Sequence, residues 1–228
     1  MSFDLGVWFE EVRPERAAAA ETYRRLCEGE AGAVQPAAGV AEFHAALVAA
    51  FPEPADDDAA GASPWSAGLS AGDGYVLMAM GFGHVDEVAP RVVELAGEHG
   101  LLCFDPQAGV VHAPPALRAP NALRLQSCAG LPVADPDLET VEGAVRGLAD
   151  DNWFVILEAG AGRFVQAGVG ASAGVAEGGF AVEYRDGAPE RHYRAELSGT
   201  EQVVSLFADF AAAPATRPAG TAWERLFG

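Results

Sequence analysis

The chain has 228 residues, half of them hydrophobic, and its 33 acidic and 14 basic side chains give a formal net charge of −19. The apolar content excludes a chain that is disordered throughout, and the negative charge argues against nucleic acid or an anionic membrane surface as a partner. All 14 basic residues are arginines, so chemistry that needs a lysine, such as a Schiff base, is excluded as well.

The cysteines and the N-terminal sequence indicate the compartment. Cys27, Cys103 and Cys128 are far apart and form no C-x-x-C pair, so neither a disulfide framework nor a structural zinc site is expected. The first residues lack the charged start and long apolar run of a secretory signal, and no apolar stretch approaches the ~20 residues of a membrane span. The sequence therefore predicts a cytoplasmic protein without a membrane segment.

Apolar periodicity in the first half predicts strands and helices in mixed order. Alternation indicates strands, and spacings of three and four indicate helices. The expected elements are a strand at 3–9, helices at 15–27 and 40–51, a hairpin of strands at 65–69 and 75–80, a helix at 86–100 and a strand at 101–104. The predicted order is β-α-α-β-β-α-β.

A proline-rich stretch at 105–121 predicts the boundary between two domains, 1–115 and 116–228. The first domain holds 18 acidic side chains and 5 arginines, and the second holds 15 and 9, so the acidity is concentrated in the first.

The second half predicts a different order of elements. Residues 122–127 are compatible with a short strand, a stripe of apolar residues predicts a helix at 137–148, and a last helix is expected from about residue 200. Between them, glycine-rich turns separate four strands, at 153–158, 163–169, 180–184 and 191–197. We expect a helix, a four-stranded antiparallel meander and a helix. The chain is thus predicted to be α+β, with two small domains that each pack a mainly antiparallel sheet with helices.

Three motifs with chemistry-bearing residues are interpreted as structural. Gly81-Phe-Gly-His84 has too few glycines for a dinucleotide-binding loop. Cys103 lies near the end of the strand predicted at 101–104 and is expected to be a buried thiol rather than a nucleophile, although His99 and His112 are near in sequence. The adjacent carboxylates at 56–58 lack the spacing of a calcium loop. The sequence predicts no catalytic residues, no metal ligands and no cofactor.

The densest polar cluster spans residues 183–194, around a turn signal at Asp186-Gly187. If the register agrees, alternation places Glu183 and Arg185 on one face of a hairpin with His192 and Arg194 opposite them. These four side chains are the candidate binding residues. The alternative is a solvated sheet face with cross-strand ion pairs.

Several segments carry a resemblance to known proteins. Ser2-Phe-Asp-Leu-Gly-Val-Trp8, Ser63-Pro-Trp-Ser66 and the segment 98–107 resemble a group of uncharacterised actinobacterial proteins. In the second half, the segments 151–158 and 180–187 are similar to small α+β immunity proteins, which accompany secreted bacterial toxins. This resemblance implies a protein partner and no catalytic residue set.

Two functions from different classes follow. The first is a non-enzymatic intracellular binding protein of the immunity type, which inhibits a basic protein partner, because complementary charge speeds association. The alternative is a small-molecule binder or enzyme that uses the face formed by Glu183, Arg185, His192 and Arg194.

Overall fold

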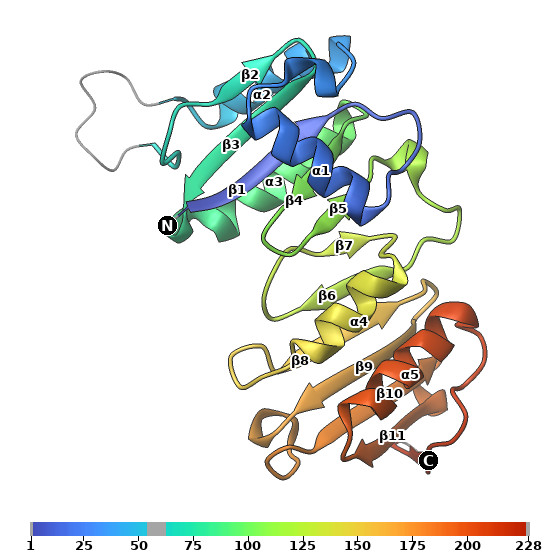
Figure 1. The fold of residues 1–228 in the computed structure, drawn as a ribbon. Coiled ribbons are helices and arrows are strands. Elements are labelled where there is room, and N and C mark those ends of the chain that lie inside the picture. The colour runs from blue at the N-terminus through green and yellow to red at the C-terminus, as the bar shows by residue number, and fades with distance from the viewer. Residues whose placement is uncertain (1, 54–62, 227–228) are drawn as a thin grey trace. The chain divides into compact units, whose positions relative to one another are not determined.

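The computed structural model describes residues 2–53 and 63–226, and the chain divides into two units, Met1–Arg118 and Ala119–Gly228 (Figure 1). Within the described residues, a five-stranded antiparallel sheet belongs to the first unit and a seven-stranded antiparallel sheet to the second, and five α-helices pack against them. The predicted α+β fold class is confirmed. The acidic run Asp56-Asp57-Asp58 lies outside the described residues.

The sheet of the N-terminal unit has the strand order β2-β3-β1-β4-β5. Its strands are β1 (Ser2–Trp8), β2 (Ser70–Gly72), β3 (Tyr75–Gly81), β4 (Leu102–Asp105) and β5 (Val110–His112), and its helices are α1 (Arg16–Cys27), α2 (Ala38–Ala50) and α3 (Val85–Glu98). The central strand β1 pairs with β3 on one side and β4 on the other, so the N-terminal strand joins two segments that are distant in sequence.

Alternation along β1 explains why both faces of this sheet are covered. Trp8 contributes to a core cluster with Ala19 and Leu26 of α1 and with Phe104 of β4. Leu5 and Val7 have the opposite parity and are fully buried on the other face. Figure 1 shows α1 over one face and α2 and α3 over the other. The N-terminal unit therefore has three layers.

The predicted strand at 65–69 is wrong in position. Trp65 forms only an isolated bridge to Met80, and the short strand β2 begins at Ser70. The indole Nε1 of Trp65 donates to the carbonyl oxygen of Phe51 at 3.0 Å, and the two rings meet edge to face. Because these contacts attach the aromatic side chain to the end of α2, its apolar character reflects helix packing rather than a strand.

Strand β5 lies inside the proline-rich stretch at 105–121, where the sequence predicts a domain boundary and no strand. It pairs with β4 through the partners Cys103 and His112 and through Phe104 and Val111. All three of its residues are buried. The prolines flank the strand and do not interrupt it. Because prolines are frequent in this stretch, the sequence did not predict the edge strand of three residues that lies between them.

The sheet of the C-terminal unit has the order β12-β11-β10-β9-β8-β6-β7. Its strands are β6 (Arg124–Ser127), β7 (Val133–Ala134), β8 (Phe154–Glu158), β9 (Arg163–Val169), β10 (Phe180–Asp186), β11 (His192–Leu197) and β12 (Glu224–Arg225), and its helices are α4 (Leu138–Arg146) and α5 (Thr200–Ala212). Strands β8 to β11 form the expected antiparallel meander. Strand β6 lies within the short strand expected at 122–127 and pairs with β8, and the structure adds β7 beyond it and β12 at the other edge.

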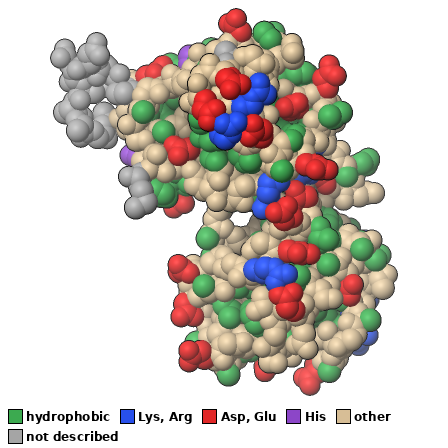
Figure 2. Space-filling view, viewed as in Figure 1, with side chains coloured by type: hydrophobic (Ala, Val, Ile, Leu, Met, Phe, Trp, Pro, Cys, Tyr) green, Lys and Arg blue, Asp and Glu red, His purple; other side chains and the backbone are tan. Residues whose placement is uncertain are grey.

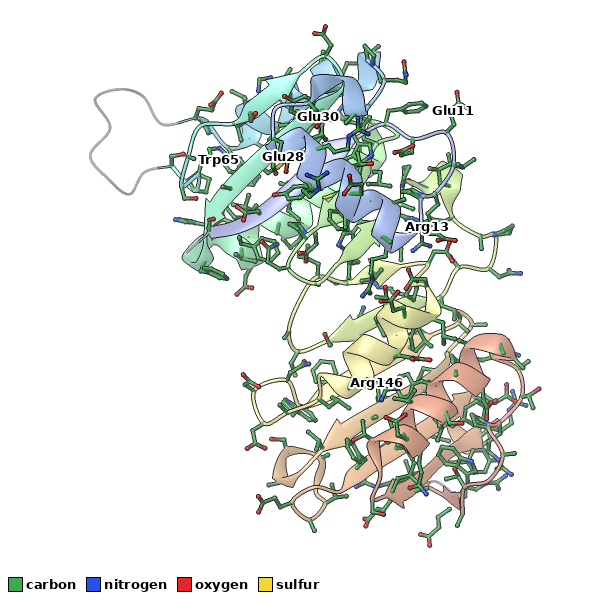
Figure 3. The ribbon with its side chains drawn as sticks, viewed as in Figure 1. Glu11, Arg13, Glu28, Glu30, Trp65 and Arg146 are labelled. Atoms are coloured by element: carbon green, nitrogen blue, oxygen red, sulfur yellow. The ribbon has the colours of Figure 1, made fainter. Side chains whose placement is uncertain are left out.

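Both helices of the C-terminal unit pack on one face of its sheet (Figure 1). Asp137 caps α4 by accepting a hydrogen bond from the amide of Thr140 at 2.7 Å. Arg146 of α4 extends towards α5 and forms an ion pair with Glu201 (Figure 3). Tyr184 lies on this face, with its ring centroid 6.2 Å from that of Phe210 in α5. The helices and the inward-facing side chains form the core of this unit.

The second face of the C-terminal sheet is the face that points away from α4 and α5. Successive residues of a strand point to opposite faces, so the neighbours of the core residues point away from the helices. They are only partly buried, and they include Phe154, Ile156, Phe164, Gln166, Glu183, Arg185, His192 and Arg194. The second face therefore carries both apolar and charged side chains.

Gly39, at the start of α2, allows a close approach to the end of α3. A Cβ at Gly39 would lie 2.7 Å from the carbonyl oxygen of His99, which is backbone and cannot rotate away. We expect Gly39→Ala to lower the free energy of unfolding by about 1–3 kcal/mol, measured by urea unfolding, because overpacking outweighs the gain in helix propensity.

Gly97→Ala is the matched control, since it also lies in a helix of this unit. Its Cβ would meet only ordinary contacts, with Pro115 Cδ nearest at 3.6 Å. This variant is expected to be as stable as the parent or more stable. Equal stability of the two variants would contradict the close packing of α2 on α3.

Candidate functional site

Strands β10 and β11 bring the four predicted residues to one face. Glu183 pairs with Arg194, and Arg185 pairs with His192. Tyr184 and Tyr193, the intervening residues, pair on the side of the helices. The register is thus the one that places Glu183, Arg185, His192 and Arg194 together on the second face.

The Glu183 carboxylate is the centre of a hydrogen-bonded network. Gln166 Nε2 donates to Oε2 at 2.9 Å, and His192 Nε2 lies 2.9 Å from the same oxygen. Arg194 donates to Oε1 at 3.4 Å. The Glu183 and His192 side chains are 15% and 14% exposed, so this network is largely shielded from water. Shielding strengthens these charge-assisted contacts relative to ion pairs at the surface.

Arg185 lies next to this network but takes no part in it. Its Nε is buried and has no hydrogen-bond partner among the described residues. Its cross-strand neighbours are Phe164 on β9 and His192 on β11, whose rings are 5.5 Å apart and meet edge to face. Three of the four predicted residues are therefore joined by hydrogen bonds, and Arg185 adds a second guanidinium beside them.

A pocket of about 330 Å³ opens on the second face beside Glu183 and Arg194. Its lining consists of Trp153, Phe154, Ile156, Gln166, Gly168, Ser172, Ala173, Ala181, Glu183 and Arg194. It therefore combines an aromatic and aliphatic side with one carboxylate, one guanidinium, an amide and a hydroxyl. That composition is typical of sites that bind small organic groups.

Most of the lining was not predicted from the sequence. Phe154 and Ile156 alternate with the buried Val155 and Leu157, so the period-two pattern placed them on the outward face, and this signal could have identified them. Gln166 carries no such signal because its role depends on the pairing of β9 with β10.

Gly168 makes room for the loop that follows β9. A Cβ at Gly168 would lie 2.8 Å from the Cβ of Ala173, so only glycine lets residues 170–174 fold over the end of β9. This loop also accepts a hydrogen bond from Arg194, whose second terminal nitrogen donates to the carbonyl oxygen of Ala173 at 3.0 Å. The loop thus forms one side of the pocket and orients the guanidinium.

The other sequence candidates lie in the N-terminal unit. Phe82–His84 forms a short 3-10 turn between β3 and α3. Cys103 is fully buried, and burial, followed by the nearby Asp105 charge, raises the pKa of its thiol. Its cross-strand partner His112 is buried as well, and its Nε2 has no hydrogen-bond partner among the described residues. A buried thiol with a raised pKa is unreactive, in keeping with the structural interpretation of Cys103.

No family model, no curated protein and no solved structure matches this chain. In the part of the chain that the structure describes, no helix is long and apolar enough to span a membrane. Over the same residues, no three His, Cys, Asp or Glu side chains group in a way that could hold a metal ion.

Acidic side chains are spread over the surface in Figure 2, and several of the visible arginines lie among them. On α1, for example, Arg24 forms ion pairs with Glu21 and Glu28. Such pairs leave the excess of carboxylates unpaired, so the surface field follows the net charge of −19.

Proposed function

We propose that the protein is a non-enzymatic binding protein that recognises a protein partner through the second face of its C-terminal sheet. The observation that carries this proposal is the mixture of partly buried apolar side chains and a shielded charged network on one face, around a pocket. Protein interfaces are enriched in aromatic residues and arginine, and their strongest contacts lie in desolvated pockets.

The apolar residues of the second face support contact with a partner. An antiparallel sheet with a solvated side normally alternates apolar residues inwards with polar residues outwards. Here Phe154, Ile156 and Phe164 occupy outward positions, and Trp153 is 38% exposed beside them. A sheet face that only meets water has no need of these side chains.

The partner that the charge favours is a basic protein, which an inhibitor of the immunity type would require. The chain carries a formal charge of −19, with 33 acidic and 14 basic side chains. Such a field steers a cationic partner into encounter, while the second face supplies short-range recognition. We place this interaction in the cytoplasm, because Cys27 and Cys128 are exposed thiols, as is usual in a reducing compartment.

A second candidate, a small-molecule binder, is favoured by one specific observation. The pocket beside Glu183 and Arg194 is within the size range of ligand sites and has few, convergent polar groups. The same site could therefore serve a ligand rather than a side chain of a partner.

The test is affinity capture from the protein's own cell lysate with a second-face variant and a matched control. Ile156→Glu places a charge at the centre of the second face, between Gln126 and Gln166. Leu138→Glu introduces the same charged residue at a side chain that is 49% exposed at the start of α4, on the side of the helices. Both variants are first checked by thermal unfolding for an unchanged fold.

We expect Ile156→Glu to reduce the amount of captured partner at least about tenfold and Leu138→Glu to leave it unchanged. Raising the salt concentration should weaken capture of a basic partner. A partner that Ile156→Glu binds as well as the parent would overturn the second face as the recognition surface. Capture of no partner at either salt concentration would favour the small-molecule candidate.

A further inference from the structure

We infer that the pocket on the second face binds a carboxylate attached to an apolar group, with the Arg194 guanidinium as the anchor of the carboxylate. The inference rests on the proposed function, since it names the chemical group that the face recognises. The last residue of a polypeptide chain, with an apolar side chain and a terminal carboxylate, has this chemistry. A small aromatic acid has it as well.

The sheet leaves a depression where an apolar group fits. Gly168 pairs with Phe154 on one side and with Ala181 on the other, and Ala173 of the following loop covers Gly168. The small side chains of Ala173 and Ala181 therefore line the pocket together with the ring of Phe154. Trp153 packs edge to face on Phe154, with ring centroids 5.1 Å apart, and extends the aromatic side of the pocket. An apolar group in the pocket beside Ala173 and Ala181 would contact these rings and Ile156.

The hydrogen bonds of the site indicate which charge it can accept. The carboxylate of Glu183 already accepts from Gln166 and Arg194 and lies 2.9 Å from His192 Nε2. Arg194 donates once from each terminal nitrogen, one of these bonds being 3.4 Å long, and its Nε has no acceptor among the described residues. The Ser172 hydroxyl, also in the lining, is another donor. Glu183 thus uses three of the roughly four acceptor sites of a carboxylate, whereas the Arg194 guanidinium uses two of its five N–H groups, so most of the remaining capacity of the pocket is for donating, as a carboxylate requires.

A cationic group fits the pocket less well. It would compete with the three groups that already contact Glu183, and it would lie beside the Arg194 guanidinium. Arg185 carries a second positive charge on the same face, next to His192. Like charges in a partly desolvated site repel each other more strongly than in water.

The test compares probes that differ only in the carboxylate. N-acetylphenylalanine and its primary amide are titrated into the ¹⁵N-labelled full chain, and the backbone amides of Gly168, Ser172 and Ala181 are followed by NMR. We expect these amides to shift, with the carboxylate bound about tenfold more tightly than the amide, the effect of one charge-assisted contact. A six-residue peptide that ends in phenylalanine, with a free or an amidated terminus, is titrated in parallel.

Arg194→Gln should remove the preference for the carboxylate, and Arg194→Lys should retain part of it, because lysine keeps the charge but loses the fork of donors. Arg124→Gln is the matched control, since Arg124 pairs with Glu158 at the end of β8 and does not line the pocket. Equal binding of acid and amide, or a preference that survives in Arg194→Gln, would overturn the inference.

The source of the carboxylate follows from the two kinds of probe. If the peptide binds more tightly than N-acetylphenylalanine, a polypeptide C-terminus is the natural occupant, and if it binds equally or less tightly, a small aromatic acid is. The proposed function is tested separately by capture with Ile156→Glu. Loss of capture in that variant without any carboxylate preference would overturn only the pocket inference, and the reverse pattern would overturn only the proposed partner surface.

Discussion

Replacing Tyr184 with alanine is expected to lower the free energy of unfolding of the C-terminal unit by about 3–5 kcal/mol, the range for removal of a buried aromatic ring. Tyr184 is 1% exposed. Its ring lies 6.2 Å from those of Phe210 and Trp223 and stacks on Tyr193 at 6.4 Å. It therefore joins β10 to β11, to α5 and to the C-terminal segment, and no neighbour can fill the volume that it leaves.

Tyr184→Phe is the control, because it keeps the ring and removes only the hydroxyl. We expect it to cost less than about 1.5 kcal/mol in urea unfolding. A small loss in Tyr184→Ala, similar to that of Tyr184→Phe, would show that the ring does not lie between the sheet and α5. Because Glu183 and Arg185 flank Tyr184 on β10, they would then not face away from the helices. The assignment of these two residues to the second face would be contradicted as well.

Acid is expected to destabilise the N-terminal unit through His112. Burial, assisted by the charges of Arg118 and Arg13, lowers the pKa of His112 to about 4 from its usual 6.5. The folded unit holds this side chain neutral, so the unfolded chain binds its proton first as the pH falls. Above pH about 6.5, His112 is neutral in both states and costs the folded unit nothing. As the pH falls from about 6.5 through about 4, the free energy of unfolding drops by about 3 kcal/mol in total because of His112.

The measurement is urea unfolding between pH 7.5 and pH 4 for the parent chain and for His112→Phe. Carboxylates titrate in both proteins, so the difference between the two curves isolates His112. We expect the stability of the parent to fall relative to that of His112→Phe as the pH is lowered. Parallel curves would mean that His112 is solvated, and hence that β5 does not hold its side chain in the interior of the unit.

The sequence was most informative where one physical signal dominates. Strong alternation predicted β1 and the meander β8 to β11, and the turn signal at Asp186-Gly187 predicted a hairpin between β10 and β11. Where contacts with distant segments determine the structure, local patterns misled. Trp65 packs on the end of α2 instead of forming a strand, and β5 is a short strand stabilised by pairing with β4.

The candidate site shows the same division. Period two was enough to place Glu183, Arg185, His192 and Arg194 on one face once the register was known. The pocket depends in addition on the order of the strands and on the loop after Gly168, which approaches β9 because that residue has no side chain. Neither property is visible in a single sequence, because both result from pairing between segments that are separated by loops.

Fluorine NMR of the chain labelled with 5-fluorotryptophan tests most directly whether the second face is the binding surface. The four tryptophans sample different places: Trp8 and Trp65 are buried in the N-terminal unit, Trp223 packs on Tyr184, and Trp153 lines the pocket on the second face. Each resonance is assigned with a Trp→Phe variant. On addition of the captured partner, or of the carboxylate probe, we expect the Trp153 resonance to shift and the other three to stay in place. A shift at Trp8, Trp65 or Trp223 with Trp153 unmoved would contradict the second face as the site of recognition.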